Sequence, residues 1–148
     1  MKTQLNSLLS AFALALLLGS HASAVSAQEA VVYKSPTCGC CSAWVDYLRD
    51  NDFTVETIDL ENLDAIKEER GISRNLQSCH PALIDGYVIE GHVPVDDIKR
   101  LLEERPEITG LSAPGMPMMS PGMASLTPRD YDVLSFDDAG NIEVYSRY

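Results

Sequence analysis

The order of short amphipathic segments between residues 31 and 105 limits the folds open to this chain. Residues 31–33 and 53–60 have the β-branched and alternating pattern of strands, whereas 41–49, 61–71 and 95–105 have helical spacing. A hairpin is predicted over 82–89, because Asp85-Gly86 separates two apolar runs. The predicted order is therefore β-α-β-α-β-β-α, an α/β fold with a mixed central sheet flanked by helices.

The composition changes after Pro106. Residues 109–128 are rich in Pro, Gly, Ser and Met and lack any periodic pattern, which predicts a long loop. Two strand-type runs follow at 131–136 and 142–145, separated by a turn sequence, and predict a C-terminal β-hairpin.

The first 27 residues have the pattern of a secretory signal peptide. Lys2 precedes an apolar run over 8–18, which is too short to span a bilayer, and small residues follow up to Ala27. Cleavage after Ala24 or after Ala27 fits this pattern, and Ala27 is favoured. We therefore expect a single domain over 28–148, a periplasmic location and no membrane insertion of the cleaved chain. The formal net charge of −11 disfavours nucleic acid as a partner.

Three of the four cysteines lie within four positions, directly after the first predicted strand: Cys38, Cys40 and Cys41. Such crowding does not suit a structural disulfide framework, because the bridges would close little chain. A structural disulfide with buried thiols, a redox pair and a soft-metal site all remain open. In the redox interpretation Cys38 is the exposed nucleophile and Cys41 resolves it. In the metal interpretation Cys79 joins the three as a fourth thiolate.

Cys40 favours the metal interpretation. A third thiol inside an exchange pair would form wrong disulfides, whereas a thiolate site for several soft ions uses it. The alternative that Cys38 and Cys41 are a thiol-disulfide exchange pair without a stable metal is kept.

The predicted order of elements is that of a thioredoxin-like fold. In this fold the active cysteines lie at the first turn of the first helix, where the helix N-terminus stabilises thiolates. A proline, usually cis, begins the third strand and faces them. Pro81 occupies that place and directly follows Cys79 and His80. We therefore expect Cys79 to lie beside the cluster and the bond before Pro81 to be cis.

Further metal ligands are predicted around these cysteines. His80 is a nitrogen donor by its position beside Cys79, and His92, in the segment EGHVP, is a lower-ranked candidate. Thioethers of the loop bind Cu(I) without deprotonation, although a purely apolar flap fits the loop equally well. These lower-ranked thioethers are Met116, Met118, Met119 and Met123.

Taken together, several motifs resemble those of the CopG-like family of exported metal-binding proteins found with copper-resistance functions. They are CGCC with Trp44, SCH, GYVIEGHVP and GLSAPGMPMMSPGM, and they extend over nearly all of residues 28–148. The resemblance implies a thioredoxin-like fold, an envelope location and Cu(I) held by Cys38, Cys40, Cys41 and Cys79, including as a multinuclear cluster. One departure is Pro81, where a small polar residue is expected.

We therefore predict a periplasmic copper-binding protein of copper resistance. Copper as Cu(I) is the expected ion, ahead of zinc or another soft metal, and a redox role coupled to copper or thiols is left open. Copper efflux or copper-carrier proteins of the envelope are the expected partners. The alternatives are a thiol-disulfide oxidoreductase using Cys38 and Cys41, and a passive module that delivers metal to an efflux partner.

Overall fold

The structure of the protein is a computed structural model that describes residues 28–125 and 127–148. The predicted signal peptide, 1–27, lies outside these residues. The described part has the elements β1 (Gln28–Lys34), α1 (Gly39–Arg49), β2 (Phe53–Asp59), α2 (Asp64–Glu69), β3 (Pro81–Ile84), β4 (Tyr87–Gly91), α3 (Val95–Glu104), β5 (Gly110–Ala113), β6 (Asp132–Phe136) and β7 (Ile142–Arg147).

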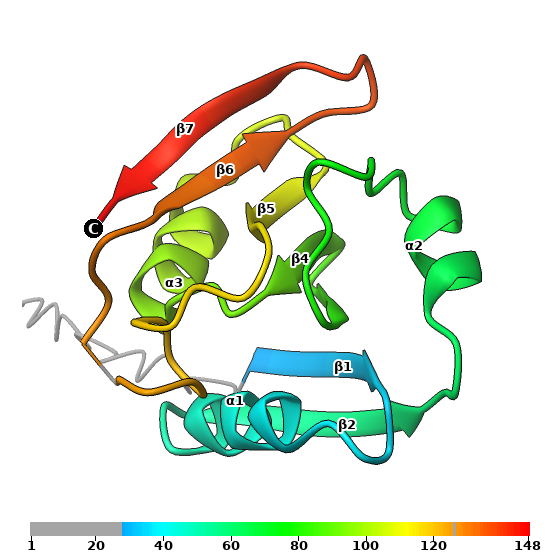
Figure 1. The fold of residues 1–148 in the computed structure, drawn as a ribbon. Coiled ribbons are helices and arrows are strands. Elements are labelled where there is room, and N and C mark those ends of the chain that lie inside the picture. The colour runs from blue at the N-terminus through cyan, green and yellow to red at the C-terminus, as the bar shows by residue number, and fades with distance from the viewer. Residues whose placement is uncertain (1–27, 126) are drawn as a thin grey trace, which may run out of the picture.

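The strands of the described residues form one mixed sheet in the order β2-β1-β3-β4-β5-β6-β7 (Figure 1). β1 and β2 are parallel and joined through α1, whereas β3 runs antiparallel to both β1 and β4. The α/β class and the predicted order of the first seven elements are confirmed. The C-terminal hairpin of β6 and β7 is also confirmed, and it extends the same sheet.

The helices cover the sheet from both sides. α1 and α3 lie on one side and α2 on the other (Figure 1). The main core joins α1 and α3 to one face of the sheet, and a smaller cluster around Ile72, Leu76 and Phe136 lies on the other. The predicted inward face of α1 is confirmed, because its buried residues are Cys41, Trp44, Val45 and Leu48. None of the described helices has the length and hydropathy that crossing a bilayer requires.

α2 differs from its prediction. It is shorter than the predicted helix over 61–71, and Leu63 and Ile66 are only partly buried. Its buried residue is Lys67, which is 5% exposed. The inward face of this helix is therefore charged, and an argument from apolar spacing could not find it.

The predicted loop over 109–128 begins with a strand. β5 pairs parallel with β4 and antiparallel with β6, and all four of its residues are buried. The sequence Gly-Leu-Ser-Ala has low strand propensity, so this strand depends on its neighbours rather than on local preference. Gly110 lies against β4 so closely that an added Cβ would lie 1.9 Å from the carbonyl oxygen of Val88.

We expect Gly110→Ala to destabilise the protein by about 3 kcal/mol, because the methyl group would force β4 and β5 apart. Gly39→Ala is the matched control, since an added Cβ there meets nothing within 4 Å. It should change the free energy of unfolding by less than about 1 kcal/mol. Denaturant unfolding measures both, and equal stabilities would show that β4 and β5 do not approach this closely.

Candidate metal centre

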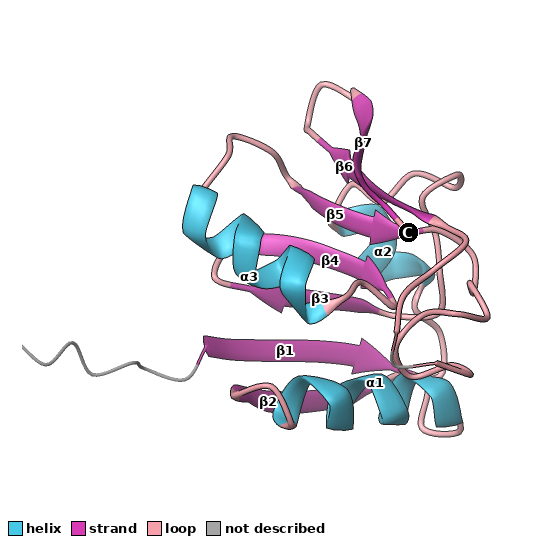
Figure 2. Cartoon of the chain, turned by 90° about the vertical axis from the view of Figure 1, so that its left-hand side faces the viewer, coloured by secondary structure: helices cyan, strands magenta, loops and turns pink. Residues whose placement is uncertain are grey.

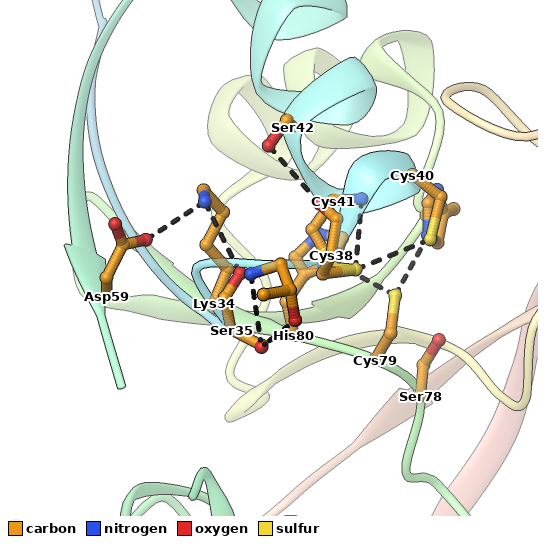
Figure 3. The surroundings of a disulfide bond; sticks show 12 residues. Lys34, Ser35, Cys38, Cys40, Cys41, Ser42, Asp59, Ser78, Cys79 and His80 are labelled. Atoms are coloured by element: carbon orange, nitrogen blue, oxygen red, sulfur yellow. Dashed lines mark hydrogen bonds and ion pairs between the residues drawn. A yellow bond between two sulfur atoms is a disulfide. The ribbon is translucent and has the colours of Figure 1, made fainter. Parts of the chain in front are cut away.

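The four cysteines meet at the end of the sheet where β1 and β4 finish and where the long loops gather (Figure 2). Cys38 caps α1, its sulfur accepting the backbone N–H of Cys41 at 3.3 Å, and Cys40 and Cys41 lie in the first helical turn. Cys79 approaches from the segment before β3 (Figure 3). All four sulfur atoms lie within 4.8 Å of one another. The predicted proximity of Cys79 is confirmed.

Two of these cysteines are oxidised. Cys38 and Cys41 form a disulfide, whereas Cys40 and Cys79 are free thiols within the described chain. The Cys40 and Cys38 sulfurs are 3.4 Å apart, and Cys40 is the donor because a disulfide sulfur carries no proton. Cys41 is fully buried and Cys38 only partly so. The redox interpretation expects an exposed Cys38, and the structure gives a partly exposed one.

Cys79 also belongs to a second group, with His80 and His92, whose ligand atoms again lie within 4.8 Å of one another. The Cys79 sulfur is 2.9 Å from Nε2 of His92 and 3.2 Å from Nδ1 of His80. His92 Nδ1–H donates to the carbonyl of Pro121 at 2.7 Å, because a carbonyl can only accept. The neutral ring therefore presents the Nε2 lone pair to Cys79, as a metal-binding imidazole does. His92, ranked low from sequence, lies within the site.

Burial controls the charge of these groups. Burial lowers the pKa of His80 well below its ordinary value, and the proximity of His92, Lys67 and Lys34 acts in the same direction. Burial likewise lowers the pKa of His92. Burial raises the pKa of the Cys79 thiol to about 12, and the neighbouring Cys40 side chain acts in the same direction. These shifts favour neutral imidazoles and a protonated Cys79 at pH 7.

Apolar and loop residues wall the site. The ring of Trp44 packs 4.6 Å from that of His80, measured between centroids, and its indole N–H donates to the Val93 carbonyl. Nε2 of His80 is buried without a hydrogen-bond partner among the described residues. The other ring nitrogen, Nδ1, lies 3.2 Å from the Cys79 sulfur, so His80 combines a contact to a soft donor with an unpartnered buried nitrogen, which is unusual for a core histidine.

The prediction of a cis bond before Pro81 is wrong, because residues 28–125 and 127–148 contain no cis peptide bond. The trans bond lets the chain run from His80 directly into β3. The His80 carbonyl accepts the N–H of Gly91 at 2.8 Å and so extends the β3–β4 pairing by one residue. Pro81 itself is tolerated because it is the first residue of the strand.

The methionine-rich loop lies against the site at two points. Pro121 accepts the hydrogen bond from His92, and Gly122 packs on α1. An added Cβ at Gly122 would lie 2.8 Å from the backbone nitrogen of Trp44, so the loop and helix are in direct contact. Met116 and Met118 are 58% and 63% exposed, whereas Met119 and Met123 are partly buried. The thioether of Met119 lies 4.0 Å from the Arg129 guanidinium.

A buried ion pair beside Cys79 was missed from the sequence. Lys67 of α2 and Glu90 of β4 approach to 2.7 Å, with side chains 6% and 0% exposed. Oε1 of Glu90 also accepts the backbone N–H of Ser78 at 2.6 Å, and the Lys67 ammonium donates to the Ser78 carbonyl. Burial raises the pKa of Glu90, and the charge of Lys67 opposes this rise. A glutamate inside the otherwise apolar run YVIEG was the one available signal.

Comparisons with known proteins agree with this description. Residues 76–123 match the model of a protein family of unknown function, DUF411. Two solved structures, form 2 and form 1 of a copper resistance protein CopG, are each 36% identical to the chain, with TM-scores of 0.76 and 0.75. The first match covers 82% of this chain and 98% of that one, and the second 81% and 96%.

No curated protein matches the chain. The identity to the CopG structures and the near-complete coverage of both of them are nevertheless well beyond what a shared fold alone produces. The chain therefore belongs to the CopG family of copper resistance proteins.

Proposed function

We propose that this protein is a periplasmic Cu(I)-binding protein of copper resistance. The single observation that carries the proposal is the convergence of four cysteine sulfurs and two neutral imidazoles in two overlapping ligand groups that share Cys79. The names of the solved CopG structures add copper as the metal. Copper is here the cargo of the protein, and periplasmic location rests on the predicted signal peptide.

The donor set fits a soft cation. Thiolates and imidazoles suit Cu(I), whereas hard ions such as Mg²⁺ and Ca²⁺ prefer oxygen ligands. The proposed ligands are Cys38, Cys40, Cys41, Cys79 and His80. His92 is a further candidate, because its Nε2 lies 2.9 Å from the Cys79 sulfur. A sulfur shared between the two groups can bridge two ions, so more than one copper ion can be held.

Oxidation state controls how many donors are available. With the Cys38–Cys41 disulfide in place, two of the four sulfurs cannot bind as thiolates. Its reduction consumes two electrons and two protons and gives two thiols, which completes the set. The helix N-terminus then stabilises thiolates at Cys38, Cys40 and Cys41. Neutral His92 and His80 have their free nitrogens available without loss of a proton.

The methionine loop is proposed as a weaker copper site that copper ions occupy as they enter or leave the cysteine centre. Pro121 and Gly122, just before Met123, contact His92 and α1, so the loop covers part of the centre. The exposed thioethers of Met116 and Met118 are neutral and soft, and they are accessible from outside. Transfer to copper carriers or efflux proteins of the envelope would pass through this surface.

A second function, thiol-disulfide exchange, is favoured by one observation. The Cys38–Cys41 disulfide lies at the start of α1, with the partly exposed sulfur of Cys38 at the helix N-terminus and Cys41 buried behind it. This arrangement suits attack by an external thiolate on Cys38 and release of Cys41. Cys40 separates the two functions, because only the metal site needs it.

We expect Cu(I) binding to depend on reduction. Protein with the Cys38–Cys41 disulfide should bind Cu(I) more weakly than protein treated with a phosphine reductant, as measured by competition with a chromogenic Cu(I) chelator. The double variant Cys38→Ser, Cys41→Ser is the control, because it cannot form this disulfide and should not respond to the reductant. Equal affinity in the two states of the unaltered protein would remove these two cysteines from the site.

We expect Cys40→Ser to lower the affinity of the reduced protein for Cu(I) by at least about 100-fold, because even outer-shell changes cost 10–100-fold. Disulfide reductase activity, if present, should be kept. Ser42→Ala, two positions further along α1, is the control and should leave chelator competition unchanged. Unaltered copper binding in Cys40→Ser would favour the oxidoreductase function.

We expect the methionine loop to affect transfer rather than affinity. Replacing Met116, Met118, Met119 and Met123 with Leu keeps bulk and apolarity but removes the thioethers. The tightest Cu(I) affinity should be unchanged, while stopped-flow transfer to an acceptor chelator should slow. Transfer at the original rate would show that the loop is only an apolar cover.

A further inference from the structure

Cys79 is held differently from the other three cysteines. Cys38, Cys40 and Cys41 are fixed by the cap and first turn of α1. Cys79 lies on the irregular segment between α2 and β3, and the β3–β4 pairing reaches only as far back as the His80 carbonyl. A residue in such a segment has no helix or strand to hold it. Its position must come from other contacts.

Those contacts converge on Ser78, the residue before Cys79. Its N–H donates to Glu90, its carbonyl accepts from Lys67, and its hydroxyl donates to the Gly115 carbonyl. Ser78 also lies directly over Gly91, where an added Cβ would come within 2.4 Å of the Ser78 Cβ. Both backbone polar groups of Ser78 are therefore fixed by the same buried ion pair.

The stability of the fold does not explain this pair. Burying two charges costs free energy, and replacing a buried ion pair with apolar residues is often neutral or stabilising. The hydrogen bonds of the pair go to each other and to Ser78, while Oε2 of Glu90 has no partner among the described residues. The pair thus acts on one short piece of backbone, next to the sulfur that the two ligand groups share.

We propose that Lys67 and Glu90 are positioning residues that fix Cys79 within the centre. They connect α2 and β4 to the Cys79 backbone through Ser78, and they do not touch the metal themselves. The consequence for copper rests on the proposed function, whereas the consequence for the Cys79 thiol does not. The two consequences are therefore tested separately.

The first test uses the reactivity of the free thiols. In protein with the Cys38–Cys41 disulfide, Cys40 and Cys79 are the free cysteines, and mass spectrometry of peptides gives the alkylation rate of each with iodoacetamide. Lys67→Met with Glu90→Leu removes both bonds to the Ser78 backbone. Lys67→Met with Glu90→Gln keeps an oxygen for its N–H. The alkylation rate of Cys79 relative to that of Cys40 should rise about tenfold in the variant with Glu90→Leu and less in the variant with Glu90→Gln.

The control removes an exposed ion pair. Arg105 and Asp85 form a salt bridge with side chains 52% and 56% exposed, so Arg105→Gln with Asp85→Asn should leave the ratio unchanged. Thermal unfolding should differ little between all the variants and the unaltered protein. A ratio that stays constant, or Cys40 and Cys79 rates that rise together, would overturn the proposal. Failure of both Lys67–Glu90 variants to fold would also overturn it, by showing a structural role.

The second test asks whether the pair acts on copper through Cys79. Reduced Lys67→Met, Glu90→Gln protein should bind Cu(I) more weakly in chelator competition. The same double change in a Cys79→Ser background should have no further effect, since its target is gone. Additive losses would contradict action through Cys79. If the unaltered protein bound no Cu(I), the proposed function would fail, and the alkylation ratio would still decide the role of the pair.

Discussion

The antiparallel pairing of β3 with β1 is the contact on which the centre depends. Val32 is opposite Ala82 and Ala30 is opposite Ile84, so β3 begins where β1 ends. The chain leaves β1 into the cap of α1 and enters β3 from Cys79. This register therefore brings Cys79 close to Cys38, Cys40 and Cys41. A slip of one residue would turn the alternating side chains over and bury the wrong face.

The same packing that brings the donors together also controls their charge. Trp44 and the core beneath it exclude water from His80, which is fully buried. Desolvation disfavours charged imidazole and thiolate alike, so without a cation the resting forms are neutral rings and a protonated Cys79. In the proposed function, a soft cation would compensate the charge of a Cys79 thiolate, whereas the neutral imidazoles would need to lose no proton.

Sequence reasoning predicted the parts that depend on local pattern. The inward face of α1, the β3–β4 hairpin with Asp85 and Gly86 at positive φ, and the approach of Cys79 to the cluster all follow from periodicity, turn chemistry and element order. It failed where neighbours override local preference. β5 has weak strand propensity and exists because β4 and β6 lie on either side of it.

Other features could not be predicted because their meaning lies in contacts between distant residues. In the sequence Lys67 has the features of an exposed helix lysine, and only the fold shows that Glu90 of β4 lies opposite it. His92 looks like a turn residue until Pro121, 29 positions later, fixes its tautomer. The role of a buried charged or polar residue depends on its interaction partners, and here those partners come from distant parts of the sequence.

The loop from Pro114 to Pro128 makes the centre depend on a third segment of the chain. Gly122 comes against Cys40 and Trp44 at a distance that no side chain allows, and its φ of +83° is one that glycine adopts without strain. The neighbouring Pro121 carbonyl orients His92, and Gly115 accepts from Ser78. The loop therefore contacts the surroundings of both ligand groups, so that moving it away would release the tautomer of His92 and one restraint on Ser78 together. Movement of the loop and loosening of His92 and Ser78 are in this way linked by two hydrogen bonds.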